Sequence, residues 1–270
     1  MFRFLIAHCV VVLALLLSVS GQLSAEINIV PHQAGYTLDI KRISRDSRVS
    51  DANGAMVYTW GETCDGWTVE QRFLLNIIQG NGHAVQLTAF SSTWEAKDGG
   101  RLRFNIKRER NGETVEKIQG EARLDAAEKS GYAEFELPKA VRIKLPKGTV
   151  FPTMHTLRLM RRAMKGFKTD RQFVFDGSEL EQASLVSAFI LPPKMPKEPN
   201  PILKPPLGPY ETRSINLAFF APASGAPEPE FEMSIALQDN GIATDLQLNY
   251  GDYAVRGTLV RLKELDKPDC

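Results

Sequence analysis

The sequence has 270 residues, with 33 lysines and arginines, 32 aspartates and glutamates, and a net charge of +1 at pH 7. A charge so close to zero argues against a nucleic-acid partner and against bulk attraction to anionic lipid, since both favour strongly basic proteins. The length is large for one domain, yet β-barrels and β-sandwiches commonly reach it.

The first 25 residues have the pattern of a secretory signal peptide. A basic start at Arg3 precedes an apolar run that ends at Leu17, and small residues follow up to Ala25. The run has about 14 apolar residues, which is short for a membrane-spanning helix, so we expect cleavage rather than anchoring. Cleavage after Ala25 is the first expectation, and cleavage near Gly21 is the alternative. We expect residues 26–270 to form a single exported domain with no further membrane-spanning segment.

Two cysteines remain after removal of this peptide. The sequence has three cysteines, of which Cys9 lies inside the apolar run. Two thiols in an exported chain usually pair, so we expect a disulfide between Cys64 and Cys270, the last residue of the sequence. This bond would join the C-terminus to an early strand.

Most of the chain alternates between apolar and polar side chains, which is the period of a half-buried β-strand. The clearest run places Trp67, Val69, Phe73, Leu75 and Ile77 on one face. The same period returns in residues 85–89, 101–107, 133–137, 231–237, 246–250 and 255–259. Pairs of residues that tolerate tight turns separate many of these runs, so neighbouring strands should be antiparallel. These pairs are Asn53-Gly54, Asn81-Gly82, Asp98-Gly99, Asn111-Gly112, Ser130-Gly131 and Asn240-Gly241.

A helix is predicted from about Thr153 to Lys165, between two of the strand runs. Thr153 is placed to cap it, and Gly166 stands where it should end. The apolar stripe expected to pack on the sheet consists of Met154, Leu157, Met160 and Met164. The opposite face is basic, and a solvated face is its simpler interpretation; contact with anionic lipid or an acidic partner is the alternative. That face carries His155, Arg158, Arg161, Arg162 and Lys165, of which the three arginines are candidate binding residues.

Residues 192–209 are rich in proline and cannot form a helix or a central strand. We expect a long surface loop within one domain, because loops of this length are usually functional or disordered. A linker between two domains is the alternative.

The sequence has none of the common catalytic or metal-binding motifs. A phosphate-binding glycine loop, a Gly-x-Ser-x-Gly turn, a Cys-x-x-Cys pair and a His-Glu-x-x-His zinc helix are all missing. The histidines outside the signal peptide, His32, His83 and His155, lie far apart in sequence, so a metal site would need the fold to gather them. We therefore expect no enzymatic activity, no metal and no cofactor.

Carboxylates and tryptophans are the remaining candidates for a site. Asp65, Asp176 and Glu179 could form a carboxylate pair, but the two aspartates each precede a glycine and are better explained as turn residues. Trp60, Trp67 and Trp94 lie in strand-like runs, where packing is the simpler role and ligand lining is the alternative. Trp67 is retained as a candidate binding residue.

Several motifs in order resemble the EipB-like cell envelope integrity family of bacterial periplasmic proteins. They are Glu62-Thr-Cys64-Asp-Gly-Trp67, Leu145-Pro-Lys-Gly-Thr-Val-Phe151-Pro-Thr153-Met-His155, Phe175-Asp-Gly-Ser-Glu179 and Asn240-Gly241, with Cys270 at the end. The resemblance implies a mainly β fold, a spiral of antiparallel strands similar to the half-barrels of lipoprotein carriers. It also implies a disulfide at the positions of Cys64 and Cys270, a role in envelope homeostasis, and a functional link to a periplasmic tetratricopeptide-repeat protein.

Two functions follow from this resemblance. The first is a non-catalytic periplasmic protein that maintains the envelope through protein contacts. The second is a carrier that shields a lipid or a lipidated peptide in its concave sheet. The apolar strand faces would serve as a filled core in the first and as a pocket lining in the second.

Overall fold

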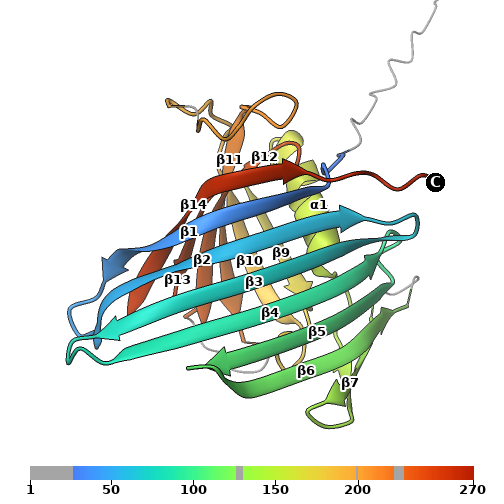
Figure 1. Cartoon of the computed structure of the whole chain (residues 1–270). Coiled ribbons are helices and arrows are strands. Elements are labelled where there is room, and N and C mark those ends of the chain that lie inside the picture. The colour runs from blue at the N-terminus through green and yellow to red at the C-terminus, as the bar shows by residue number, and fades with distance from the viewer. Residues whose placement is uncertain (1–26, 126–129, 199, 222–227) are drawn as a thin grey trace, which may run out of the picture.

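Fourteen strands form one antiparallel sheet in a computed structural model that describes residues 27–125, 130–198, 200–221 and 228–270 (Figure 1). The predicted signal peptide, residues 1–25, lies outside the described residues. The prediction of a mainly β fold with one helix is confirmed, the helix being α1 (Pro152–Met164). The strands are β1 (His32–Ile43), β2 (Val49–Glu62), β3 (Gly66–Gln79), β4 (Ala84–Ala96), β5 (Arg101–Arg110), β6 (Glu113–Leu124), β7 (Gly131–Leu137), β8 (Val141–Leu145), β9 (Thr169–Val174), β10 (Ser184–Ile190), β11 (Thr212–Phe220), β12 (Phe231–Gln238), β13 (Ala243–Asn249) and β14 (Tyr253–Glu264).

The sheet curls into an almost closed spiral. Its strand order runs from β8 down to β1, continues with β14, and then runs down to β9, so the first and last strands pair in the middle. The two edge strands, β8 and β9, are therefore consecutive in the chain apart from α1. Val150 makes an isolated parallel bridge with Val174 across the seam, donating its N–H to Phe173 O (2.9 Å) and accepting from Phe175 N–H (3.1 Å).

Apolar alternation sets which face of each strand turns inward. In β5, Leu102, Phe104 and Ile106 are all buried, as the period predicts. In β7, Ala133 and Phe135 are buried, but Leu137 is 41% exposed. A register shift in the β6–β7 pairing precedes Leu137, which explains why its alternation does not continue.

Glycines mark most of the predicted turns. Gly82, Gly99, Gly112 and Gly241 all adopt positive φ, as expected for tight connections. Of the predicted turn residues Ser130 and Gly131, the first directly precedes β7 and the second begins it, and residues 126–129 before them lie outside the described part. The prediction of a turn at Asn53-Gly54 is wrong, because both residues lie inside β2. A Cβ atom at Gly54 would lie 2.0 Å from Leu74 O of β3, so close strand approach explains this glycine.

Part of the interior of the spiral is filled by α1, which contributes to one of three core clusters. Figure 1 shows the helix between a near wall of β1–β7 and a far wall of β9–β13. Leu157, Leu159, Met160 and Ala163 are buried in one cluster with side chains of both walls. The wall residues of this cluster include Trp60 of β2, Val186, Ala188 and Ile190 of β10, Ile215 and Leu217 of β11, and Leu237 of β12.

The predicted helix is present, with two differences. Thr153 is not its cap: the helix begins at Pro152, and Phe151 at the N-cap makes no side-chain hydrogen bond. Met164 is 45% exposed instead of packed, because the buried face is centred on Leu157 and Met160. Gly166 follows the helix with φ +78°, the left-handed conformation that ends it.

The proline-rich segment 192–209 connects β10 and β11, which pair with each other in the sheet. Leu203 is 5% exposed and packs with Leu246 and Leu259 in a core cluster. Asn200 Nδ2 donates to Leu259 O (2.8 Å), and Gln238 Oε1 accepts from Tyr210 N–H (2.8 Å). The loop is therefore held against the sheet at its middle and at its C-terminal end.

Candidate functional site

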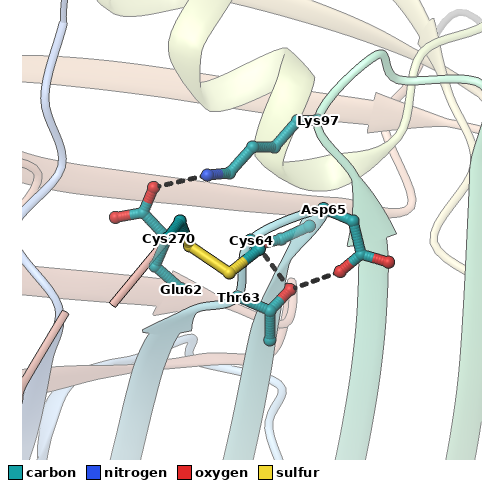
Figure 2. Close-up of a disulfide and its surroundings, with 7 residues drawn as sticks. Glu62, Thr63, Cys64, Asp65, Lys97 and Cys270 are labelled. Atoms are coloured by element: carbon teal, nitrogen blue, oxygen red, sulfur yellow. Dashed lines mark hydrogen bonds and ion pairs between the residues drawn. A yellow bond between two sulfur atoms is a disulfide. The ribbon is translucent and has the colours of Figure 1, made fainter. Parts of the chain in front are cut away.

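The predicted cysteines are bonded, and their disulfide ties the end of the chain to the β2–β3 turn (Figure 2). The two Cα atoms lie 5.7 Å apart. The turn around Cys64 is fixed by Thr63, whose N–H donates to Gly66 O (2.8 Å) and whose hydroxyl donates to Asp65 Oδ1 (3.0 Å). Both cysteines are exposed, so the bond lies at the rim of the spiral and not in its core.

A pocket of about 380 Å³ adjoins this rim. Its apolar walls are the indoles of Trp60 and Trp67, 6.4 Å apart between ring centroids, and Leu157 of α1. Lys97 and Glu62 line it as an ion pair with 2.8 Å between Nζ and Oε1, drawn beside the disulfide in Figure 2. Residues 27–29 complete the lining. Trp67, a candidate binding residue, therefore lies at a hollow with an apolar wall and a charged pair.

Trp94 serves a different role from the other two tryptophans. It pairs across β3 and β4 with Thr68, one residue out of step with the pocket residue Trp67, and the Arg103 guanidinium lies 5.2 Å from its ring centroid. Trp94 is absent from the pocket lining. The pocket thus separates Trp60 and Trp67 from Trp94, which sequence alone does not distinguish.

Glu95 of β4 caps the start of α1, a role that the sequence analysis missed. Its carboxylate is 2% exposed and accepts from the backbone N–H groups of Thr153 (2.7 Å) and Met154 (2.8 Å). These N–H groups belong to the first turn of the helix, where no intrahelical acceptor exists. A carboxylate there also interacts favourably with the helix dipole.

Burial raises the pKa of Glu95 to about 7, although the hydrogen bonds from Met154 and Thr153 act in the opposite direction. The carboxyl group therefore titrates near neutral pH while it holds the helix. A strongly shifted carboxyl in a cleft is often catalytic. Here both oxygens are taken by backbone N–H groups of α1, so the geometry assigns Glu95 to helix anchoring.

Two of the three candidate arginines are occupied within the fold. Arg158 Nε and Nη2 donate to the two carboxylate oxygens of Asp170 on β9 at 2.7 and 3.0 Å. Arg162 Nε lies 3.0 Å from the same carboxylate, whose side chain is 3% exposed. Arg161 is exposed and makes no ion pair with another described residue. The prediction of a freely solvated basic face is therefore wrong for Arg158 and Arg162, because Asp170 draws both against β9.

His155 is also buried, contrary to the prediction that it lies on the wet face. It is 6% exposed, and its Nε2 atom has no hydrogen-bond partner among the described residues. Burial lowers the pKa of His155 to about 4, which keeps the ring neutral at pH 7. His32 begins β1 and His83 lies in the β3–β4 turn, so the fold leaves the histidines on separate elements. No group of three His, Cys, Asp or Glu side chains in the described part could hold a metal ion.

The carboxylates considered in sequence do not form a catalytic pair. Asp65 accepts from Thr63, and Asp176 Oδ1 accepts from Ser178 N–H (2.9 Å), so both act as turn residues. Glu179 makes an ion pair with Arg108 at 3.1 Å. Within the described ranges, no helix is long and apolar enough to cross a membrane.

A family model and a similar protein identify the family of this chain. The EipB-like family model matches residues 23–266. The chain is 29% identical over 248 residues to the cell envelope integrity protein EipB of Brucella abortus (strain 2308), covering 90% of this chain and 87% of that protein. It also resembles the crystal structure of a β-barrel-like protein of a domain of unknown function from Brucella abortus. That match has a TM-score of 0.83 and 27% identity, and it covers 89% of this chain and 100% of that one.

Proposed function

Because the chain belongs to the EipB-like family, we propose that it maintains cell envelope integrity as a non-catalytic periplasmic protein that acts through protein contacts. The name of the Brucella abortus relative supports the envelope role. The signal-peptide pattern of residues 1–25 and the disulfide both favour an oxidising compartment outside the cytoplasm.

The filled interior is the observation that carries the choice of protein contacts. A carrier of the half-barrel type needs an open concavity, but here α1 occupies part of it with Leu157, Leu159, Met160 and Ala163, and side chains of the strands and loops form two further core clusters. The helix is fixed at its start by Glu95 and along its side by Asp170. A spiral packed in this way offers its rim and outer surface for binding, and not its interior.

The rim pocket is the proposed contact site. Its volume of about 380 Å³ is near the lower end of the roughly 300–1,000 Å³ of small-ligand sites. A hollow between Trp60, Trp67 and Leu157 suits an apolar side chain projecting from a partner, and aromatic residues in such positions often dominate binding energy. We propose a periplasmic tetratricopeptide-repeat protein as the partner, on the strength of the family resemblance.

A lipid or a lipidated peptide is the second candidate ligand. The apolar wall of the rim pocket favours it, since an acyl chain would bury against the same two indoles and Leu157. The disulfide weighs against it, because it restrains the rim that a carrier must open to load and release cargo.

Complementation of a deletion strain tests this function. We expect the deletion to sensitise cells to detergents and to wall-directed antibiotics, and the wild-type gene to restore resistance. Trp67→Ala should fail to restore it at normal protein levels. Trp94→Ala is the matched control, because Trp94 lies on the neighbouring strand outside the pocket. Equal rescue by both variants would contradict the pocket's role.

Affinity purification followed by native mass spectrometry distinguishes the two ligands. We expect wild-type protein from envelope extracts to retain a repeat-protein partner that Trp67→Ala loses and Trp94→Ala keeps. Stoichiometric lipid in place of a protein partner would reverse the ranking of the two functions.

A further inference from the structure

The turn between α1 and β9 exposes apolar and basic side chains that the fold leaves uncovered. Every residue from Met164 to Thr169 is exposed, and Met164 and Phe167 are 45% and 47% exposed. The turn is nevertheless fixed, because Phe167 N–H donates to Arg162 O (3.0 Å). Ile190 N–H also donates to Lys168 O (2.8 Å), which fastens the turn to β10.

A third apolar side chain belongs to the same surface. Phe189 of β10 pairs with Thr169 across the β9–β10 ladder and is 47% exposed. Its neighbours along the strand, Ala188 and Ile190, are buried, so Phe189 is on the outward face. The ring of Phe167 lies 4.1 Å from the Arg162 guanidinium, which holds it at the surface. Large exposed apolar groups gathered in this way mark interaction sites.

The segment that carries Met164 and Phe167 is basic, whereas Phe189 lies in a hollow of β10–β13 that is lined by polar residues and Glu232. Asp170 is the only acidic residue between Pro152 and Phe175, and it is 8% exposed and engaged by Arg158 and Arg162. The remaining cations are exposed and make no ion pair with another described residue. They are Arg161, Lys165, Lys168 and Arg171. The surface is thus locally positive, although the whole chain is nearly neutral.

We propose that this surface, Arg161 to Arg171 with Phe189, docks the protein on an anionic lipid bilayer. Met164, Phe167 and Phe189 would enter the boundary between headgroups and acyl chains, while the cations contact phosphate headgroups. Long lysine and arginine side chains suit this arrangement, since they reach headgroups while their stems cover apolar surface. The favoured occupant is a membrane and not an acidic protein, because exposed apolar side chains flanked by exposed cations match the acyl chains and the anionic headgroups of a bilayer.

Docking through this surface is compatible with a partner at the rim pocket. The pocket includes Lys97, which is close in sequence to Glu95, the residue that caps the N-terminal end of α1. The lipid-facing turn follows the C-terminal end of the same helix. The pocket reaches α1 at Leu157, whereas the proposed lipid-facing surface begins at Arg161, so the two surfaces share no residue, and the membrane proposal does not rest on the identity of a protein partner.

Vesicle co-sedimentation tests the proposal. Residues 26–270 with the disulfide intact should bind vesicles of phosphatidylcholine that contain about one third phosphatidylglycerol, and should not bind phosphatidylcholine alone. Binding should weaken as salt rises, because exposed charges are screened. Each basic residue near an anionic surface contributes about fivefold in affinity, so K165E combined with K168E should reduce binding by about 25-fold or more. F167S should also reduce binding.

The hairpin between β5 and β6 supplies matched controls. Val115 is 62% exposed and Lys117 is exposed, so V115S and K117E change similar side chains on another surface. These variants should bind anionic vesicles as the wild type does. All variants should have the melting temperature of the wild type. No binding to anionic vesicles, equal binding to neutral vesicles, or equal losses in the turn and hairpin variants would each overturn the proposal.

Discussion

Glu95 makes the stability of the fold depend on pH in a direction that can be measured. Its pKa is raised from 4.5 to about 7 by burial beneath α1. The folded protein therefore holds this proton more tightly than the unfolded chain does. The stabilising contribution of the protonated group is complete below about pH 4.5 and is lost as pH rises through about 7. At about 1.4 kcal/mol for each pKa unit, the loss amounts to about 3 kcal/mol.

His155 acts in the opposite direction over nearly the same range. Its pKa is lowered from 6.5 to about 4, so the unfolded chain takes up this proton first as pH falls. The stabilising contribution of the neutral imidazole is present above about pH 6.5 and is lost as pH falls through about 4. In the wild type the two groups change the unfolding free energy with pH in opposite directions, and these changes largely cancel. Single variants are therefore needed to separate them.

Glu95→Gln removes the pH dependence of stability that is due to Glu95. The substitution keeps the size of the side chain and abolishes its titration. Between pH 4.5 and pH 7.5 we expect the wild type to lose about 3 kcal/mol of unfolding free energy relative to E95Q. Urea unfolding followed by tryptophan fluorescence at several pH values measures this difference, with the disulfide kept intact. E113Q, at an exposed glutamate of β6, is the control and should run parallel to the wild type. Parallel curves for E95Q and the wild type would refute the reasoning.

Three further substitutions, the last with Arg161→Glu as its control, test the contacts that stabilise the fold. Cys64→Ser removes a disulfide that spans 206 positions and should lower the free energy of unfolding by at most about 5 kcal/mol, the loop-closure entropy. Equal unfolding midpoints of the wild type with and without reductant would argue against this. Leu157→Asp places a charge at a site that is 5% exposed and should destabilise by about 3–5 kcal/mol in thermal unfolding, whereas unchanged melting would mean that α1 contributes little. Arg158→Glu should lower the free energy of unfolding by about 3 kcal/mol, because it places a second carboxylate beside buried Asp170. Arg161→Glu should change this free energy by no more than about 0.5 kcal/mol. Equal urea midpoints for the two variants would contradict the pairing of Arg158 with Asp170.

Local patterns in the sequence predict much of this fold. The alternation of Leu102, Phe104 and Ile106 identifies β5 and its buried face, because a strand has the same period wherever it lies in a sheet. The helix is recognisable from the spacing of Leu157 and Met160 and from Gly166 beyond its end. The pairing of Cys64 with Cys270 follows from the small number of thiols in an exported chain.

Contacts between distant segments are what the sequence does not reveal. Glu95 and Thr153 are 58 positions apart, and nothing near Glu95 marks it as the cap of a helix. Arg158 looks solvated because its partner, Asp170, lies on the next element and reaches it only when α1 folds against β9. A helix with the sheet on more than one side also has more than one buried face, which explains how His155 is buried although it lies off the predicted apolar stripe.

These long-range contacts bear directly on the choice between the two proposed functions. Cargo inside the spiral would require α1 to leave, exposing Leu157, Leu159 and Met160, at about 1.5–3 kcal/mol for each side chain. Its departure would also separate Asp170, whose side chain is 3% exposed, from Arg158 and Arg162. Together these losses approach the whole free energy of unfolding of a typical domain, about 5–15 kcal/mol. Binding of a ligand in the interior would have to supply nearly all of this free energy. A ligand at the rim pocket displaces none of these groups. Binding at the rim therefore requires less reorganisation than carriage inside the sheet, whichever chemical class the ligand has.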